Sequence, residues 1–102
     1  MIDKFKNEHI DLLFKAMKSL DTIEDYYKFF DDICTIVEIN EMSKRLQAAI
    51  MLDSEVVYTE ITRETGLSTA TISRVNKSLR YGSDGYALAI KNLRESGEIA
   101  EK

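Results

Sequence analysis

The sequence predicts an all-α protein, and three observations support this fold class. Its 102 residues include no proline and only four glycines, so residues that break helices are scarce. Ala, Leu, Glu, Lys and Met, which favour helices, are frequent. No stretch alternates apolar and polar residues long enough to indicate a β-sheet. Because this length suits one domain and is too short for two, we expect residues 1–102 to form a single domain.

Apolar residues spaced three and four positions apart predict the individual helices. The expected helices span residues 2–20, 22–33, 36–53, 58–65, 69–79 and 84–96. In the first of them an apolar stripe runs from Ile2 to Leu20, and charged side chains fill the other face. Because a chain of this size buries a limited share of its surface alone, a second copy would help to cover this stripe.

Capping side chains support two of these helix starts. Asp21 or Thr22 precedes the second helix, and each has an acidic residue three positions later. Thr35 and Glu38 form the same pattern before the third helix. A Ser or Thr hydroxyl followed at this spacing by a carboxylate satisfies two backbone N–H groups at a helix start.

The composition favours a reduced, cytoplasmic protein without a cofactor. Cys34 is the single cysteine, which excludes an intramolecular disulfide, and its apolar neighbours predict a buried thiol. His9, the single histidine, lies beside the apolar stripe as a packed or interfacial side chain, and with Cys34 it makes no zinc pattern. We expect no metal and no catalytic residue. The N-terminus lacks a signal-peptide pattern, and no run approaches the ~20 apolar residues of a membrane span.

Charge is distributed unevenly along the chain. The net charge is −4, yet residues 65–83 contain three basic side chains and no acidic one. The three are Arg74, Lys77 and Arg80. Because salt screens charges beyond ~8 Å, a locally positive face can contact phosphate even on a negative protein.

Residues 58–80 match a helix-turn-helix. Gly66 suits the end of the first helix, where the chain must turn through a left-handed residue. Ser68 is a cap for the second helix. Apolar anchors that would pin the two helices together are Ile61, Leu67, Ile72 and Val75. The second helix of such a motif lies in the major groove, so the expected partner is double-stranded DNA.

The side chains that the anchors leave free suit contact with DNA. Compact hydroxyl and methyl groups at the start of the second helix can approach base edges, and Arg74 can reach a guanine edge or a phosphate. Lys77 and Arg80 suit the phosphate backbone, and the helix dipole favours phosphate at the helix start. The predicted DNA-binding residues are Arg63, Ser68, Thr69, Ala70, Thr71, Ser73, Arg74, Lys77 and Arg80.

The segment GLSTATISRVNKSL at 66–79 resembles the recognition segment of the Trp repressor family. It is most similar to the YerC/YecD-like branch of that superfamily. The tracts that carry this similarity are TIEDYYKFFDDICTIVEINEMSKRL (22–46), YTEI (58–61), STATISRVNKSL (68–79) and YGSDGY (81–86). The resemblance therefore spans residues 20–90.

The resemblance implies a six-helix protomer and an intertwined homodimer. Residues 2–53 would form the helical dimerisation core, 58–80 the DNA-binding head and 84–96 a C-terminal helix. Two heads on one dimer would face half-sites about one helical turn apart. The implied function is a transcriptional regulator, most simply a repressor, that binds a specific DNA sequence.

The resemblance also implies a position for a small-molecule effector. In the Trp repressor, tryptophan lies between the dimer core and the recognition helix, and the matching positions here are Thr35, Arg45, Arg74 and Ser78. Val75 replaces the glycine against which the indole ring would lie. Because an isopropyl group fills that space, we expect the motif to bind DNA without tryptophan. Thr59 and Thr62 replace basic residues of the family's first motif helix, which leaves phosphate contact to Arg63 and the basic residues of the second helix.

Two other functions stay open at this point. A small helical enzyme similar to chorismate mutase would need cations that converge on a dicarboxylate, and Lys44, Arg45 and Gln47 are its candidates. Alternatively, the motif could bind protein as an adaptor. Binding to duplex DNA that weakens steeply with salt would favour the regulator over both.

Overall fold

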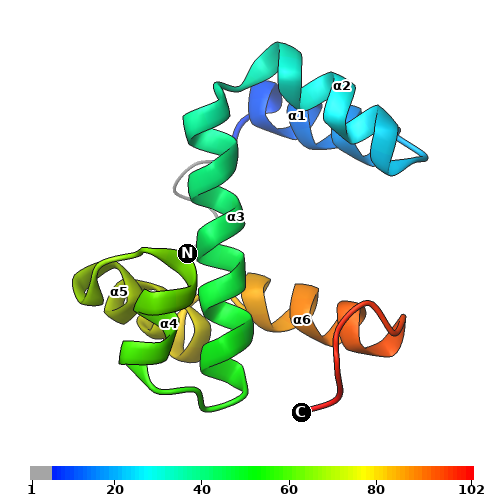
Figure 1. Cartoon of the computed structure of the whole chain (residues 1–102). Helices are drawn as coiled ribbons and strands as arrows, with labels where there is room; N and C mark the ends of the chain where they lie inside the picture. The colour runs from blue at the N-terminus through cyan, green and yellow to red at the C-terminus, as the bar shows by residue number, and fades with distance from the viewer. Residues whose placement is uncertain (1–5) are drawn as a thin grey trace. The chain divides into compact units, whose positions relative to one another are not determined.

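The computed structural model describes residues 6–102, and within that range it contains six α-helices and no strand (Figure 1). The all-α prediction is confirmed. In chain order the helices are α1 (Glu8–Lys18), α2 (Ile23–Ile33), α3 (Ile36–Asp53), α4 (Tyr58–Thr65), α5 (Thr69–Tyr81) and α6 (Gly85–Glu95). The bounds of α3 and α4 are those predicted, and the other bounds differ by at most two residues, apart from the start of α1.

The predicted start of the first helix is wrong. Lys6 and Asn7 are not helical, and α1 begins at Glu8. The side-chain oxygen of Asn7 accepts a hydrogen bond from the backbone N–H of Ile10 at 2.9 Å. This cap satisfies an N–H group that would otherwise lack a helical partner, and it fixes the helix start. Residues 1–5, with Ile2 of the predicted stripe, lie outside the described residues.

Both predicted capping sites form. Thr22, rather than Asp21, caps α2 by accepting from the N–H of Asp25 at 3.1 Å. At the start of α3 the hydroxyl of Thr35 accepts from the N–H of Glu38 at 3.1 Å, and the Glu38 carboxylate accepts from the N–H of Thr35 at 2.8 Å. This reciprocal pair lowers the pKa of Glu38, because the backbone N–H of Thr35 stabilises the ionised carboxylate.

The chain divides into two compact units: the first ends at Ile39, and the second runs from Asn40 to Lys102. The described part of the first unit holds α1, α2 and the first turn of α3, and none of its residues is buried. A hydrogen bond of 3.1 Å from the Tyr26 hydroxyl to the Met17 carbonyl joins α2 to α1. Its large apolar side chains that are at least half exposed are Leu12, Phe14, Ile23, Tyr27, Ile33, Ile36 and Val37.

The first unit also corrects one expectation about single side chains. The predicted burial of Cys34 is wrong, because its free thiol is half-buried and the neighbouring Ile33 and Ile36 are themselves exposed. His9 is exposed on α1, so it is not packed within the single chain. Its interfacial position stays a prediction.

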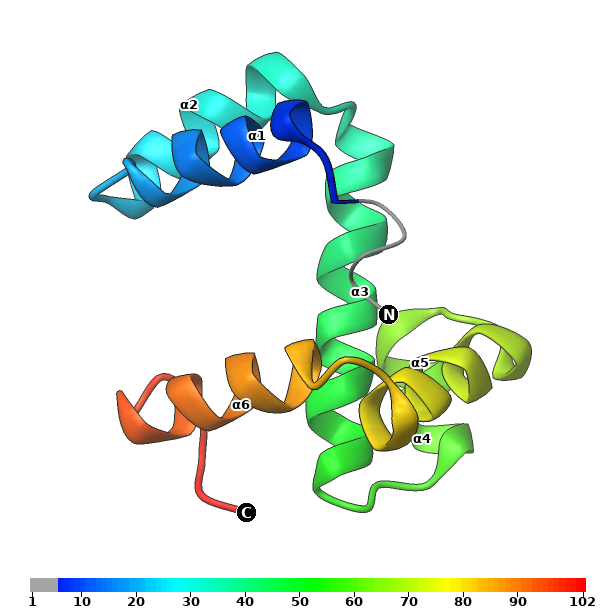
Figure 2. The same ribbon diagram turned by 180° about the vertical axis from the view of Figure 1, so that it is seen from behind.

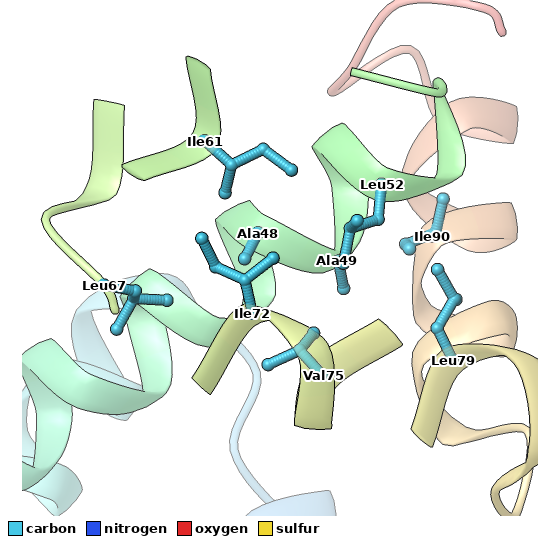
Figure 3. Close-up of a cluster of buried hydrophobic side chains, with 9 residues drawn as sticks. All are labelled: Ala48, Ala49, Leu52, Ile61, Leu67, Ile72, Val75, Leu79 and Ile90. Atoms are coloured by element: carbon cyan, nitrogen blue, oxygen red, sulfur yellow. The ribbon is translucent and has the colours of Figure 1, made fainter. Parts of the chain in front are cut away.

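The second unit contains a continuous apolar core (Figure 3). It is built by nine buried side chains: Ala48, Ala49 and Leu52 of α3, Ile61 of α4, Leu67 of the following turn, Ile72, Val75 and Leu79 of α5, and Ile90 of α6. All four predicted anchors of the helix-turn-helix are among them. Within this unit α4 and α5 lie on one side of α3, while α6 extends to its other side (Figures 1 and 2).

Arg94 ties the C-terminal segment to the end of α3. Its side chain is 13% exposed and forms an ion pair with Asp53. It also donates to the hydroxyl of Ser54 and to the carbonyl of Ala100, both at 3.3 Å. The Lys102 ammonium adds a second ion pair to Asp53 at 3.8 Å.

Among the described helices, none is long and apolar enough to cross a membrane.

Candidate nucleic-acid interface

The turn between α4 and α5 is set by a left-handed glycine. Gly66 has φ +76° and ψ 1°, and its N–H donates to the carbonyl of Thr62 at 2.8 Å. Residues with a side chain are strained at this φ, so glycine allows the chain to turn sharply here. The buried hydroxyl of Thr65 donates to the Ile61 carbonyl at 2.7 Å and accepts from the Leu67 N–H at 3.2 Å. Thr65 therefore closes the turn from inside, a role that its sequence position did not indicate.

The second helix of the motif begins as predicted. Ser68 is the N-cap of α5, and its hydroxyl accepts from the N–H of Thr71 at 3.2 Å. The two hydroxyls also lie within hydrogen-bond distance of each other, at 3.2 Å. Ser68 and the half-buried Thr71 therefore have hydrogen-bond partners within the helix start itself.

The outward surface of α5 is polar and free of acid. The exposed side chains of this surface are Thr69, Ala70, Ser73, Arg74 and Lys77. Ile72 and Val75 point instead into the core, which fixes the orientation of the helix (Figure 3). A surface of small side chains beside two flexible cations can approach both base edges and phosphates.

The other two predicted phosphate contacts have partners within the protein. The Arg80 guanidinium donates to the carbonyl of Leu52 at 3.0 Å and to the side-chain oxygen of Asn76 at 3.3 Å. Arg63 pairs with Glu60 through two N–H donors, one of them at 3.1 Å. Hydrogen bonding between them lowers the pKa of Glu60 and raises that of Arg63. These arginines are less available than Arg74 and Lys77.

A cavity of about 240 Å³ lies beside α5. Its lining residues are Arg45, Thr71, Arg74, Val75, Ser78 and Tyr86. Four of the five predicted effector positions are therefore brought together. Thr35 belongs to the other unit, where it caps α3. Tyr86 was missed because the sequence gives no signal that α6 turns its first residues toward this face of α5.

The three residues considered for an enzyme are divided between two cavities. Arg45 lines the cavity beside α5, whereas Lys44 and Gln47 line a second one with Glu64 and Thr65. Adjacent positions on a helix point about 100° apart, which explains why Lys44 and Arg45 separate. Among the described residues, no group of three or more His, Cys, Asp or Glu side chains is arranged to hold a metal ion.

The turn, the capped second helix and the buried anchors define the chain as a helix-turn-helix protein. Residues 8–94 match the family described as Trp repressor protein, and the chain belongs to the Trp repressor family. It is 46% identical over 95 residues to the uncharacterized protein YerC of Bacillus subtilis (strain 168), covering 93% of this chain and 91% of that protein.

Two solved structures have the same fold. A candidate Trp repressor from Staphylococcus aureus is 40% identical with a TM-score of 0.87, and the match covers 100% of this chain and 98% of that one. A TrpR-like protein from Eubacterium eligens ATCC 27750 is 44% identical with a TM-score of 0.85, covering 98% and 99%. The predicted membership of the family and its YerC-like branch is confirmed.

Proposed function

We propose that this protein is a transcriptional regulator, a repressor in keeping with its family, that binds a specific sequence of double-stranded DNA. The observation that carries the proposal is the surface of α5: small and basic side chains, with no acid, on a helix whose orientation is fixed by buried anchors. Arg74 and Lys77 supply the main charge, and the first turn of α5 supplies contacts to bases.

The proposed active form is a homodimer. The described part of the first unit buries no residue in the single chain and exposes a series of apolar side chains. Apolar area on this scale is stabilised when a second copy covers it. Two copies would present two motifs, which matches the way that helix-turn-helix dimers bind paired half-sites.

We further propose that DNA binding does not require tryptophan. The residues of the cavity beside α5 supply cations and hydroxyls, but Val75 is 4% exposed and its side chain belongs to the core. Tyr86 adds an aromatic ring to the same cavity. Val75 lines this cavity where the family has the glycine against which the indole lies, and this replacement carries the proposal. Adding L-tryptophan should therefore leave the affinity for duplex DNA unchanged, and a rise in affinity would contradict this.

Selection of bound duplexes from a random pool tests the proposal. We expect an enriched motif with two half-sites about one helical turn apart, and an affinity that falls steeply as salt rises. Absence of enrichment, or affinity insensitive to salt, would overturn the proposal and favour an adaptor that binds protein. Conversion of a dicarboxylate substrate such as chorismate would favour the enzyme instead.

A further inference from the structure

Glu60 and Arg63 form a paired contact on the surface of α4. The Nε of Arg63 donates to one carboxylate oxygen of Glu60 at 3.1 Å, and a terminal guanidinium nitrogen pairs with the other oxygen. The side chains are 72% exposed for Arg63 and 42% for Glu60. The contact therefore uses the same fork of N–H donors that an arginine offers to a phosphate.

The position of this pair matters because of its helix. In a helix-turn-helix the first helix crosses the DNA backbone, and α4 is that first helix. A guanidinium fork held by a carboxylate cannot bind a phosphate with the same donors. An exposed ion pair contributes little stability, so a well-placed phosphate can displace Glu60.

From this geometry we propose that Glu60 is a specificity-determining residue, which withholds Arg63 from phosphates that are not held in register. The inference rests on the proposed binding to DNA. A contact to phosphate carries no sequence information, and such contacts supply nearly all of the affinity for unrelated DNA. If Glu60 did not hold Arg63, the protein could shift along unrelated DNA until a phosphate met the free guanidinium. At a specific site, base contacts from α5 fix the register, so a free Arg63 adds less.

Glu64 provides a matched control. It lies next to Arg63 on the same helix. Its charge helps to raise the pKa of Arg63, whereas Glu60 raises that pKa mainly through a hydrogen bond. Glu60→Gln and Glu64→Gln each remove one negative charge from α4. The two variants therefore separate release of Arg63 from a general change in charge.

The experiment measures binding to an unselected duplex and to a selected one across a salt series. We expect Glu60→Gln to bind the unselected duplex about fivefold more tightly, with a salt slope steeper by about 0.9 for one added phosphate contact. The gain on the selected duplex should be smaller. Glu64→Gln should leave the slope unchanged, and Arg63→Ala should abolish the gain of Glu60→Gln when the two are combined.

Four results would overturn the inference. Equal gains in affinity and equal salt slopes for the two glutamate variants would mean that Glu60 acts only through its negative charge. Weaker binding by Glu60→Gln would mean that Glu60 orients Arg63 toward phosphate instead of withholding it. A wild-type protein that binds no duplex would overturn the proposed function as well, whereas wild-type binding with an unchanged Glu60→Gln variant overturns the inference alone.

Discussion

The two arginines of α5 differ in how strongly the fold holds them. The guanidinium of Arg80 donates to the carbonyl of Leu52 on α3, so it joins α5 to α3 within the second unit. Arg74 makes a hydrogen bond of 3.5 Å to the carbonyl of Ala70 on its own helix, at the upper end of hydrogen-bond distances. Arg74 can therefore move to a base or phosphate at less cost than Arg80, which would lose its hydrogen bond to α3.

This difference predicts distinct effects of two substitutions. Arg74→Ala should weaken binding to the selected duplex by roughly 1–3 kcal/mol and leave the melting temperature unchanged. Arg80→Ala should lower the melting temperature, because it leaves a carbonyl at the end of α3 without that donor. Titration with labelled duplex and thermal unfolding measure the two quantities. Unchanged affinity in Arg74→Ala would remove this side chain from the interface.

Two glycines near the start of α6 predict opposite effects on stability. A Cβ at Gly82 would lie 2.3 Å from the backbone oxygen of Ser78, which cannot move without disturbing α5. Gly82→Ala should therefore destabilise the protein by about 1–3 kcal/mol. A Cβ at Gly85 meets nothing within 4 Å. Gly85→Ala should therefore stabilise the fold by about 0.4–1 kcal/mol, because alanine lowers the conformational entropy of the unfolded chain. Denaturant titration of both variants checks this, and similar changes in the two would contradict it.

Residues with local roles could be predicted from the sequence, whereas those with distant partners could not. Gly66, Ser68 and Thr35 act within three or four positions of themselves, so spacing alone identified them. Tyr86 lines a cavity with residues of α3 and α5, and Arg80 bonds to a carbonyl 28 positions away. Such contacts depend on how helices pack, which a periodic pattern does not specify.

At the scale of elements, periodicity predicted the helices better than their starts. The bounds of α3 and α4 agree with the prediction, because the apolar positions and the flanking residues indicate the same limits. The start of α1 does not agree, because the apolar spacing extends to the N-terminal side of Asn7, whereas the asparagine cap makes the helix begin at Glu8. Local hydrogen bonding to a side chain decides the boundary over the apolar pattern.

The capping box of α3 predicts a dependence of stability on pH. The N–H of Thr35 stabilises the Glu38 carboxylate and lowers its pKa below 4.5 in the folded chain. A carboxyl group whose pKa is lower in the folded chain stabilises the fold at pH values above its pKa in the unfolded chain. This contribution is lost as pH falls through the pKa of the folded chain. Glu38→Gln keeps a hydrogen-bond acceptor but does not titrate.

The melting temperature of wild type should therefore exceed that of Glu38→Gln at pH 7, and the difference should shrink as pH falls below 4.5 and vanish once pH has fallen through the lowered folded pKa. Thermal unfolding of both proteins by circular dichroism across this pH range measures the difference, and the other carboxyl groups, common to both proteins, cancel. A difference that grows on acidification would contradict the assigned role of Glu38.

At the scale of the whole molecule, burial is concentrated in one unit. All ten described residues that are buried lie at Ala48 or beyond, whereas the described part of the first unit exposes apolar side chains along α1, α2 and the start of α3. Helices of this length are marginal in water unless an apolar face is packed. The high exposure of Ile23 and Tyr27, at 73% and 74%, is what the homodimer that we propose would cover.

The homodimer that we propose can be tested at α1. Leu12 is 65% exposed in the single chain, so Leu12→Asp leaves the interior of one protomer unaffected but places a charge in the proposed interface. We expect wild type to sediment as a dimer and Leu12→Asp to dissociate. Lys18→Asp, on the polar side of the same helix, should remain dimeric. A dimeric Leu12→Asp would place the interface elsewhere. Dissociation should also weaken binding to paired half-sites although Arg74 is intact, because each isolated motif then binds its half-site alone.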